Sequence, residues 1–305
     1  MSVFQRIFNN QIHYISNVDR LGWSLDEEYL TPPDGYISNG EFVIHRGCYS
    51  IGDWSIISAM PRILKEHYPK CKVYVTSENF AEKMYGPIEF NKQNVWGHWK
   101  NPYLNVRHVF DNNPYVDGYI DSYEGEIYHD HFRIRDPQNE ADPLILQMLR
   151  WHGIFLTLED DFAPELYFSD EEKQQFEEFK QNIFGKSEYG SFSYRVNFPE
   201  RDYKSHRLEW VQRKLDEYND LPFMYYFDDS VFNFNLNKVL TANGLDVRLI
   251  LYLICNSKVV TGLQSGVYDA CGRYTDIKVL AAASSIAGMN EHYLPSIKYT
   301  FLGEK

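Results

Sequence analysis

The sequence predicts an α/β fold in two domains, and three observations support this prediction. Residues 42–77 follow the order strand, glycine-bearing turn, helix and strand, which is a βαβ unit. Residues 258–274 repeat the order of strand, glycine turn and helix in the second half of the chain. The length of 305 residues suits two domains of about 150 residues each.

The first βαβ unit indicates where a ligand would bind. Its first strand is the apolar run 42–44, its helical pattern extends to Leu64, and its second strand alternates around Val73. Ligands of such units bind at the carboxyl ends of the strands, so the turn at 47–53 is the expected site. The one carboxylate of this turn is Asp53, at the start of the helix. Aspartate is also a favoured N-cap, which would stabilise the helix by about 1 kcal/mol without any catalytic role.

The order of elements after Gly52 and Asp53 resembles the opening of the lipopolysaccharide heptosyltransferase family. The Gly-Asp pair is followed by a short apolar helix that contains Pro61, and then by a basic helix end that leads through Tyr68 and Pro69 into a strand. Members of that family are GT-B glycosyltransferases, in which two Rossmann-like domains face a cleft. The resemblance implies this architecture here, with Asp53 as the general base and Gly52 on the acceptor side.

Composition and charge argue against several other classes of protein. The net charge of -13 disfavours a broad nucleic-acid surface, because phosphate contacts need clustered Lys and Arg. The four cysteines show no CxxC spacing, so neither a disulfide framework nor a zinc site is expected. The start lacks a basic segment followed by an apolar one, and no window approaches about 18 apolar residues. We therefore expect a cytoplasmic protein without a membrane span.

The chain divides into an extension and two domains. Residues 1–38 end in strong turn chemistry and are expected to form an N-terminal extension packed on the first domain. The polar, glycine-flanked stretch at 185–190 is the expected domain boundary. The resemblance then implies an acceptor domain at 39–187 and a nucleotide-sugar-binding domain at 188–305.

Further elements follow from local patterns. A short strand is expected at 106–110, and the phrase Asn-Pro-Tyr-Val-Asp at 113–117 resembles one that precedes a strand in the heptosyltransferases. Helices are expected at 144–151 and at 170–184, the second capped by Ser169. The second half is expected to hold strand 191–196, helix 208–218, strand 222–227, helix 245–255, the unit at 258–274 and one last strand.

Two histidines make a possible ligand pair. His129 and His131 would share one face of a strand, because side chains at i and i+2 point the same way, and such a pair could ligate a metal. No third ligand is in register with them. Structural or acceptor-contacting roles are therefore favoured, and we expect no metal site.

Basic residues gather in one stretch of an otherwise acidic chain. They are Arg195, Arg201, Lys204, His206 and Arg207, in the first strand–helix turn of the second half. A diphosphate leaving group needs cationic or amide donors, which such a turn could supply. A solvated basic surface is the alternative. The resemblance matches Lys204 to the family lysine that neutralises the leaving diphosphate. Arg195, in the same basic stretch, is a further candidate donor-binding residue.

The segment at 264–269 is the second candidate phosphate site. Backbone amides at a helix start bind anions, so Ser265, Gly266 and Val267 form an expected anion nest. The phrase resembles the heptosyltransferase motif Asp-Ser-Gly, two residues, then His, which cradles the donor diphosphate. Here Gln264 replaces the aspartate, and Asp269 stands where the histidine would be and is a candidate acceptor-side residue.

The motifs that the sequence lacks argue against several classes of enzyme. The chain has no G-x-G-x-x-G or Walker loop, no G-x-S-x-G elbow and no Asp-x-Asp, the usual metal-and-nucleotide ligand of GT-A glycosyltransferases. We expect a metal-independent glycosyltransferase that moves a sugar from a nucleotide diphosphate donor to a hydroxyl acceptor, either a glycan or a lipopolysaccharide-like molecule, and that needs no cofactor.

Two alternatives remain open at this stage. One is a phage-type glycosyltransferase acting on hydroxymethylated DNA bases, which the Tyr- and Asn-rich composition favours and the acidic charge disfavours. The other is a nucleotide-sugar-binding protein that kept the fold and lost turnover, which the replacements at Gln264 and Asp269 favour.

Overall fold

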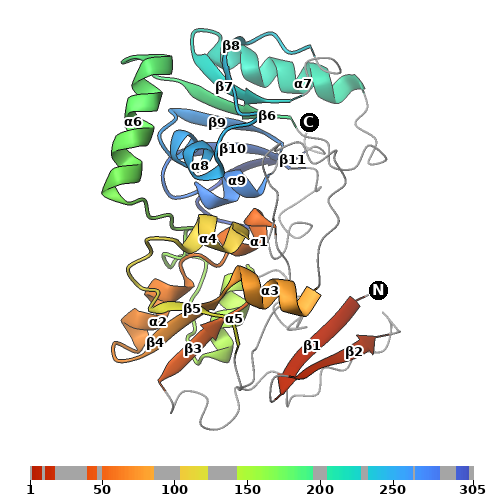
Figure 1. The fold of residues 1–305 in the computed structure, drawn as a ribbon. Coiled ribbons are helices and arrows are strands. Elements are labelled where there is room, and N and C mark those ends of the chain that lie inside the picture. The colour runs from red at the N-terminus through yellow and green to blue at the C-terminus, as the bar shows by residue number, and fades with distance from the viewer. Residues whose placement is uncertain are drawn as a thin grey trace. The chain divides into compact units, whose positions relative to one another are not determined.

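Two compact units make up the part of the chain that the structure describes (Figure 1). The structure is a computed structural model that describes residues 2–8, 11–17, 40–46, 50–85, 104–122, 143–194, 205–227, 233–263, 265–281 and 293–301. The first unit contains the described residues up to Tyr167, together with Tyr293, and the second contains the others from Phe168 onward. The boundary expected at 185–190 lies after this division, because the helix that precedes it belongs to the second unit.

The expected N-terminal extension contains a β-hairpin. Strands β1 (Ser2–Phe8) and β2 (Gln11–Asn17) pair antiparallel, with Ser2 opposite Asn17 and Phe8 opposite Gln11. The sequence analysis predicted no strand in this region.

The first unit is organised around a parallel sheet of the order β3-β4-β5. Its strands are β3 (Glu41–Ile44), β4 (Lys72–Thr76) and β5 (Gly118–Ile120). This confirms the predicted strands of the opening βαβ unit. Helices α1 (Ile51–Ser55) and α2 (Met60–His67) replace the single predicted helix. Pro61 lies in the first turn of α2, where its missing N–H costs no helical hydrogen bond.

Three more helices belong to the first unit: α3 (Glu78–Tyr85), α4 (Asn105–Phe110) and α5 (Leu144–Trp151). The prediction of a strand at 106–110 was wrong, because this segment forms α4. Val106, Val109 and Phe110 are buried at positions i, i+3 and i+4, which is the spacing of a helix face. The helix predicted at 144–151 is confirmed as α5.

The second unit contains a parallel sheet of the order β11-β10-β9-β6-β7-β8. From β6 the chain adds strands in one direction, and from β9 it adds them in the other. This is the strand order of a dinucleotide-binding Rossmann sheet. Its strands are β6 (Gly190–Ser193), β7 (Pro222–Tyr226), β8 (Asn237–Thr241), β9 (Val259–Leu263), β10 (Asp276–Ala281) and β11 (Lys298–Phe301). The sequence analysis did not predict strands β8 and β11.

Helices cover both faces of this sheet (Figure 1). Phe192 and Tyr194 pack with Val211 of α7 on one face, while Ser191 and Ser193 lie on the face of α8 and α9. The predicted Ser169 cap of α6 is confirmed as a complete capping box with Glu172. The helices are α6 (Asp170–Phe184), α7 (Ser205–Leu215) with the 3-10 turn Asp216–Tyr218, α8 (Val247–Cys255) and α9 (Gly266–Ala270). Over the described ranges, no helix has the length and apolar character that a membrane crossing requires.

Candidate functional site

The second unit places its candidate site where the strand order reverses. Strands β6 and β9 are neighbours there, and the chain leaves them toward opposite edges of the sheet. Ligands of open parallel sheets bind beyond the carboxyl ends of the strands at this point. Ser193 ends β6, and Ser265 and Gly266 follow β9, so both segments lie at the expected crevice of this sheet.

The segment predicted as an anion nest forms the start of α9. Ser265 is the N-cap residue with extended backbone angles (φ -150°, ψ 140°), and its carbonyl oxygen accepts from the Tyr268 amide at 2.8 Å. The first amides of a helix have no carbonyl partner within that helix, which leaves those of Gly266 and Val267 to meet a ligand. The Val267 side chain is buried, so only its amide can contribute.

A glycine brings β9 and β6 close together beside this turn. Gly262 has φ of 136°, and a Cβ atom there would lie 2.0 Å from the carbonyl oxygen of Ser193. Only glycine tolerates both this φ and this approach of two backbones. Gly262 lies within β9.

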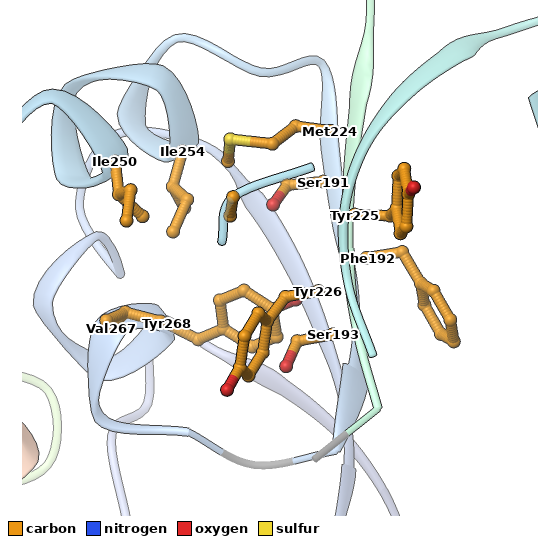
Figure 2. Close-up of a pocket in the computed structure, with 11 residues that line it drawn as sticks. Ser191, Phe192, Ser193, Met224, Tyr225, Tyr226, Ile250, Ile254, Val267 and Tyr268 are labelled. Atoms are coloured by element: carbon orange, nitrogen blue, oxygen red, sulfur yellow. The ribbon is translucent and has the colours of Figure 1, made fainter. Parts of the chain in front are cut away.

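A small cavity lies under α9, between the sheet and helix α8 (Figure 2). Ser191, Ser193, Tyr226 and Tyr268 point toward it from the strands and from α9. Its volume is about 10 Å³, which is the room that one water molecule needs. The cavity is therefore part of the interior that supports α9, and it is too small for a nucleotide.

A hydrogen bond from Tyr268 connects helix α9 to strand β9 of the sheet. Its hydroxyl donates to the Thr261 carbonyl oxygen at 3.2 Å. Burial raises the pKa of Tyr268 far above its ordinary value, although hydrogen bonds with Ser191 and Ser193 oppose the shift. The phenol therefore stays protonated at neutral pH.

Asp269 does not have the exposure of an acceptor-contacting residue. It lies in α9 among the buried residues of the second unit, near Cys271. Burial, and then the neighbouring Cys255, raise the pKa of the Cys271 thiol. The acceptor-side role of Asp269 stays a prediction.

The first unit places Asp53 at the carboxyl end of β3, as predicted. His45 and Arg46 follow the strand directly, and Asp53 is the third residue of α1. The N-cap interpretation of Asp53 is wrong, because Ser50 occupies the N-cap position with extended backbone angles. Gly52, beside Asp53, is buried.

Asp53 forms an ion pair with Arg46. The distance from Arg46 Nη2 to Asp53 Oδ1 is 3.2 Å, and the two side chains are 4% and 18% exposed. The carboxylate can therefore reach solvent, while the guanidinium lies in the interior behind it. An ion pair of this kind holds one carboxylate oxygen in place.

Other polar groups follow the three strands of the first sheet at the same edge. His45 Nδ1 lies 2.7 Å from Thr76 Oγ1 at the end of β4. Ser77 caps α3 by accepting from the Phe80 amide at 3.1 Å, and its hydroxyl donates to Asp121 after β5. This bond is the main cause of the lowered pKa of Asp121.

The sequence analysis missed Arg46, Ser77 and Asp121. Each follows a strand of the first sheet, at the carboxyl edge where ligands of parallel sheets bind. Their positions directly after strands are the feature of the sequence that could have identified them as candidate site residues.

Several predicted site residues lie outside the described residues. They are Arg195, Lys204, Gln264, His129 and His131. Among the residues that the structure does describe, no group of three His, Cys, Asp or Glu could hold a metal ion.

Comparisons with known proteins bear on the fold. No protein-family model and no curated protein matches the sequence. Among solved structures, the chain is similar to the E. coli ADP-heptose lipopolysaccharide heptosyltransferase II, with a TM-score of 0.51 and 13% identity over 85% of this chain and 89% of that one. A family 9 glycosyltransferase from Veillonella parvula DSM 2008 also matches, with a TM-score of 0.48 and 10% identity over 86% and 84% of the two chains. The prediction of a GT-B-like α/β fold, similar to that of the heptosyltransferases, is confirmed by the likeness to the E. coli structure.

Proposed function

We propose that the chain is a glycosyltransferase that moves a sugar from a nucleotide diphosphate donor to a hydroxyl acceptor. The main support is the sheet of the second unit, whose strand order reverses between β6 and β9 next to the amides that start α9. The similar E. coli structure is that of an enzyme named for an ADP-heptose donor and a lipopolysaccharide acceptor. A nucleotide diphosphate sugar is the corresponding donor class for this chain.

The donor diphosphate is assigned to the second unit. In this proposal, the amides of Gly266 and Val267 and the Ser265 hydroxyl bind its oxygens, since amides at a helix start are donors aimed at an anion. Arg195 and Lys204 supply positive charge to the leaving group, and Gln264 takes the place of the family aspartate in the same turn.

Asp53 is assigned the role of general base. The acceptor hydroxyl oxygen forms a bond to the anomeric carbon of the donor sugar while the bond from that carbon to the diphosphate oxygen breaks. The hydroxyl proton passes to the Asp53 carboxylate, and the electron pair of the broken bond leaves with the diphosphate. Asp53 suits this role because its carboxylate is partly exposed at the carboxyl end of β3, where ligands of parallel sheets bind.

The test is transfer and slow hydrolysis with a panel of nucleotide diphosphate sugars, scored by release of the nucleoside diphosphate. The parent protein is expected to cleave at least one donor. Asp53→Asn is expected to lower turnover about a hundredfold, the scale of general acid–base catalysis, while donor affinity stays within twofold of the parent. Added EDTA is expected to change nothing, because the proposed step uses no metal ion.

Asp117→Asn is the matched control, since Asp117 is 19% exposed and ion-paired with Lys65, much as Asp53 is 18% exposed and ion-paired with Arg46, but precedes strand β5 instead of following a strand. It is expected to retain most of the turnover. If Asp53→Asn binds donor and keeps more than about a tenth of the parental rate, Asp53 is not the base.

The same panel, together with a DNA-binding assay, tests the two alternatives, a binding protein without turnover and a glycosyltransferase acting on DNA. A chain that binds a nucleoside diphosphate but cleaves no sugar from it would be a nucleotide-sugar-binding protein. A gel shift with hydroxymethylated DNA at low and moderate salt would reveal a DNA acceptor.

A further inference from the structure

We infer that Arg46 is a positioning residue that fixes the Asp53 carboxylate, and that this contact sets the rate of the sugar transfer. The inference rests on the proposed function. It assigns a role to a residue that the sequence analysis did not single out.

The difference in exposure within the ion pair is the first argument. The Arg46 side chain is 4% exposed, and the Asp53 side chain is 18% exposed. A buried guanidinium gives up its hydration, and an ion pair with a carboxylate does not make such burial an efficient source of stability. Asp53 is the more exposed member of the pair, so Arg46 is placed to act on a ligand through that carboxylate.

The position of the pair along the chain is the second argument. Arg46 follows β3, and Asp53 lies in the first turn of α1; residues 47–49 between them lie outside the described residues. The bond between Arg46 Nη2 and Asp53 Oδ1 ties the strand end to the helix start. It therefore restricts both the helix start and the rotation of the carboxylate.

Orientation is the contribution expected from this contact. A general base must lie within hydrogen-bond reach of the proton that it accepts, and a misplacement of about 1 Å can cost about a hundredfold in rate. The Arg46 contact holds one oxygen of the Asp53 carboxylate, so it restricts where the other oxygen points.

The surroundings hold the Arg46 end of the pair in place. The preceding residue, His45, is fully buried, and its ring lies 5.2 Å from that of Phe80 and 6.4 Å from that of Trp54, the residue after Asp53. Its Nδ1 lies 2.7 Å from Thr76 Oγ1 at the end of β4. Aromatic packing and a second strand thus fix the backbone from which Arg46 extends.

The experiment is a double-mutant cycle on turnover with Arg46→Gln, Asp53→Asn and the combined variant, with donor affinity measured for each by calorimetry. Arg46→Gln is expected to lower kcat about a hundredfold while the Kd of the donor stays within twofold. The combined variant is expected to be no slower than Asp53→Asn alone, because Arg46 acts only through Asp53.

Two further variants separate positioning from folding. Arg46→Lys keeps the charge and loses the planar fork, so it is expected to recover part of the lost kcat. Arg248→Gln is the matched control, because Arg248 is 8% exposed and pairs with Glu172 at 2.7 Å between α6 and α8. It is expected to lower the stability and leave the kcat of the folded protein unchanged.

The outcomes are distinct. Unchanged kcat in Arg46→Gln, or losses that multiply in the combined variant, would overturn the role of Arg46 while leaving the proposed function intact. A kcat loss of similar size in Arg248→Gln would overturn it too, since a general structural effect would then explain both. If the parent cleaves no donor, both the proposed function and this inference fall.

Discussion

The two units support the carboxyl edges of their sheets with different groups. In the first unit, ionisable side chains lie in the interior beside the strands, with Arg46 and His45 after β3 and His152 packed on Phe42 of the same strand. In the second unit, hydroxyl groups fill the comparable place, with Ser191, Ser193 and Tyr268 around a cavity of about one water molecule.

Because the supporting groups differ, the two units should respond to different perturbations. Ionisable groups in an interior couple stability to pH, since burial disfavours their charged forms. Hydroxyl groups and close backbone contacts depend on shape instead, because they carry no titratable charge near neutral pH. The interior around His152 in the first unit is therefore expected to be sensitive to pH, and the close approach of β9 to β6 in the second unit to added volume.

The largest expected effect is the loss of the second sheet in Gly262→Ala. The new Cβ atom would lie 2.0 Å from the Ser193 carbonyl oxygen, and backbone cannot give way as a flexible side chain can. The substitution is expected to cost more than about 4 kcal/mol, the range of severe backbone and packing changes. Hydrogen exchange should show lost protection in β9 and β6, with the amides of β3 and β4 unchanged.

Gly185→Ala is the control for this substitution. Gly185 also has a positive φ, 63°, but a Cβ atom there would meet nothing within 4 Å. Its expected cost is about 1–3 kcal/mol, the penalty of a backbone conformation that L residues rarely adopt (φ 63°, ψ -131°). Equal losses for the two variants would mean that the approach of β9 to β6 does not matter.

A smaller effect is expected when the pH falls from 7 to 5. Burial lowers the pKa of His152 to about 4, below the value of about 6.5 expected in the unfolded chain. Below pH 6.5 the unfolded chain therefore binds a proton that the folded chain does not. Stability is present above pH 6.5 and is lost as the pH falls toward 4, by about 2 kcal/mol between pH 6.5 and 5. Urea unfolding at pH 7 and 5 measures this loss.

His152→Phe tests whether the imidazole causes the loss. The Tyr68 hydroxyl donates to the backbone carbonyl of His152, at 2.6 Å, so this bond does not depend on the side chain. The phenyl ring keeps an aromatic contact with Phe42 and cannot bind a proton. If the variant loses as much stability between pH 7 and 5 as the parent does, His152 is not the cause.

The sequence predicted some elements of both units and missed others. Strands whose apolar pattern matches their burial, such as β3 and β9, were predicted, as was α6 with its Ser169 cap. Strand β8 was missed because it lies at the sheet edge with alternating partly exposed residues and no apolar run. Helix α4 was mistaken for a strand because six residues hold too few turns to show a helical period.

The candidate site shows a similar limit. Asp53 was found because its turn belongs to a recognisable βαβ unit. Arg46 was not, because its bond to Asp53 spans seven residues and depends on how the strand and helix pack. The roles of Gly262 and Tyr268 were missed too, since each depends on a neighbouring strand that local pattern does not identify.

The smallest expected effect is that of Tyr268→Phe. The change removes one hydroxyl that donates to the Thr261 carbonyl oxygen at 3.2 Å and leaves the ring in place. A buried hydrogen bond of this kind contributes about 1 kcal/mol net, so the free energy of unfolding is expected to fall by about that amount. Urea unfolding of the variant and the parent at pH 7 and at pH 5 measures it.

The same loss is expected at both pH values. Burial keeps the pKa of Tyr268 far above this range, so the phenol is neutral in the folded protein throughout. A free tyrosine, with a pKa of about 10, is also neutral in the unfolded chain, and no proton is exchanged on unfolding. A loss that differed between pH 7 and 5 by more than about 1 kcal/mol would show that the hydroxyl group is coupled to an ionisable neighbour. The interior under α9 would then resemble that of the first unit, and the contrast between the two would not hold.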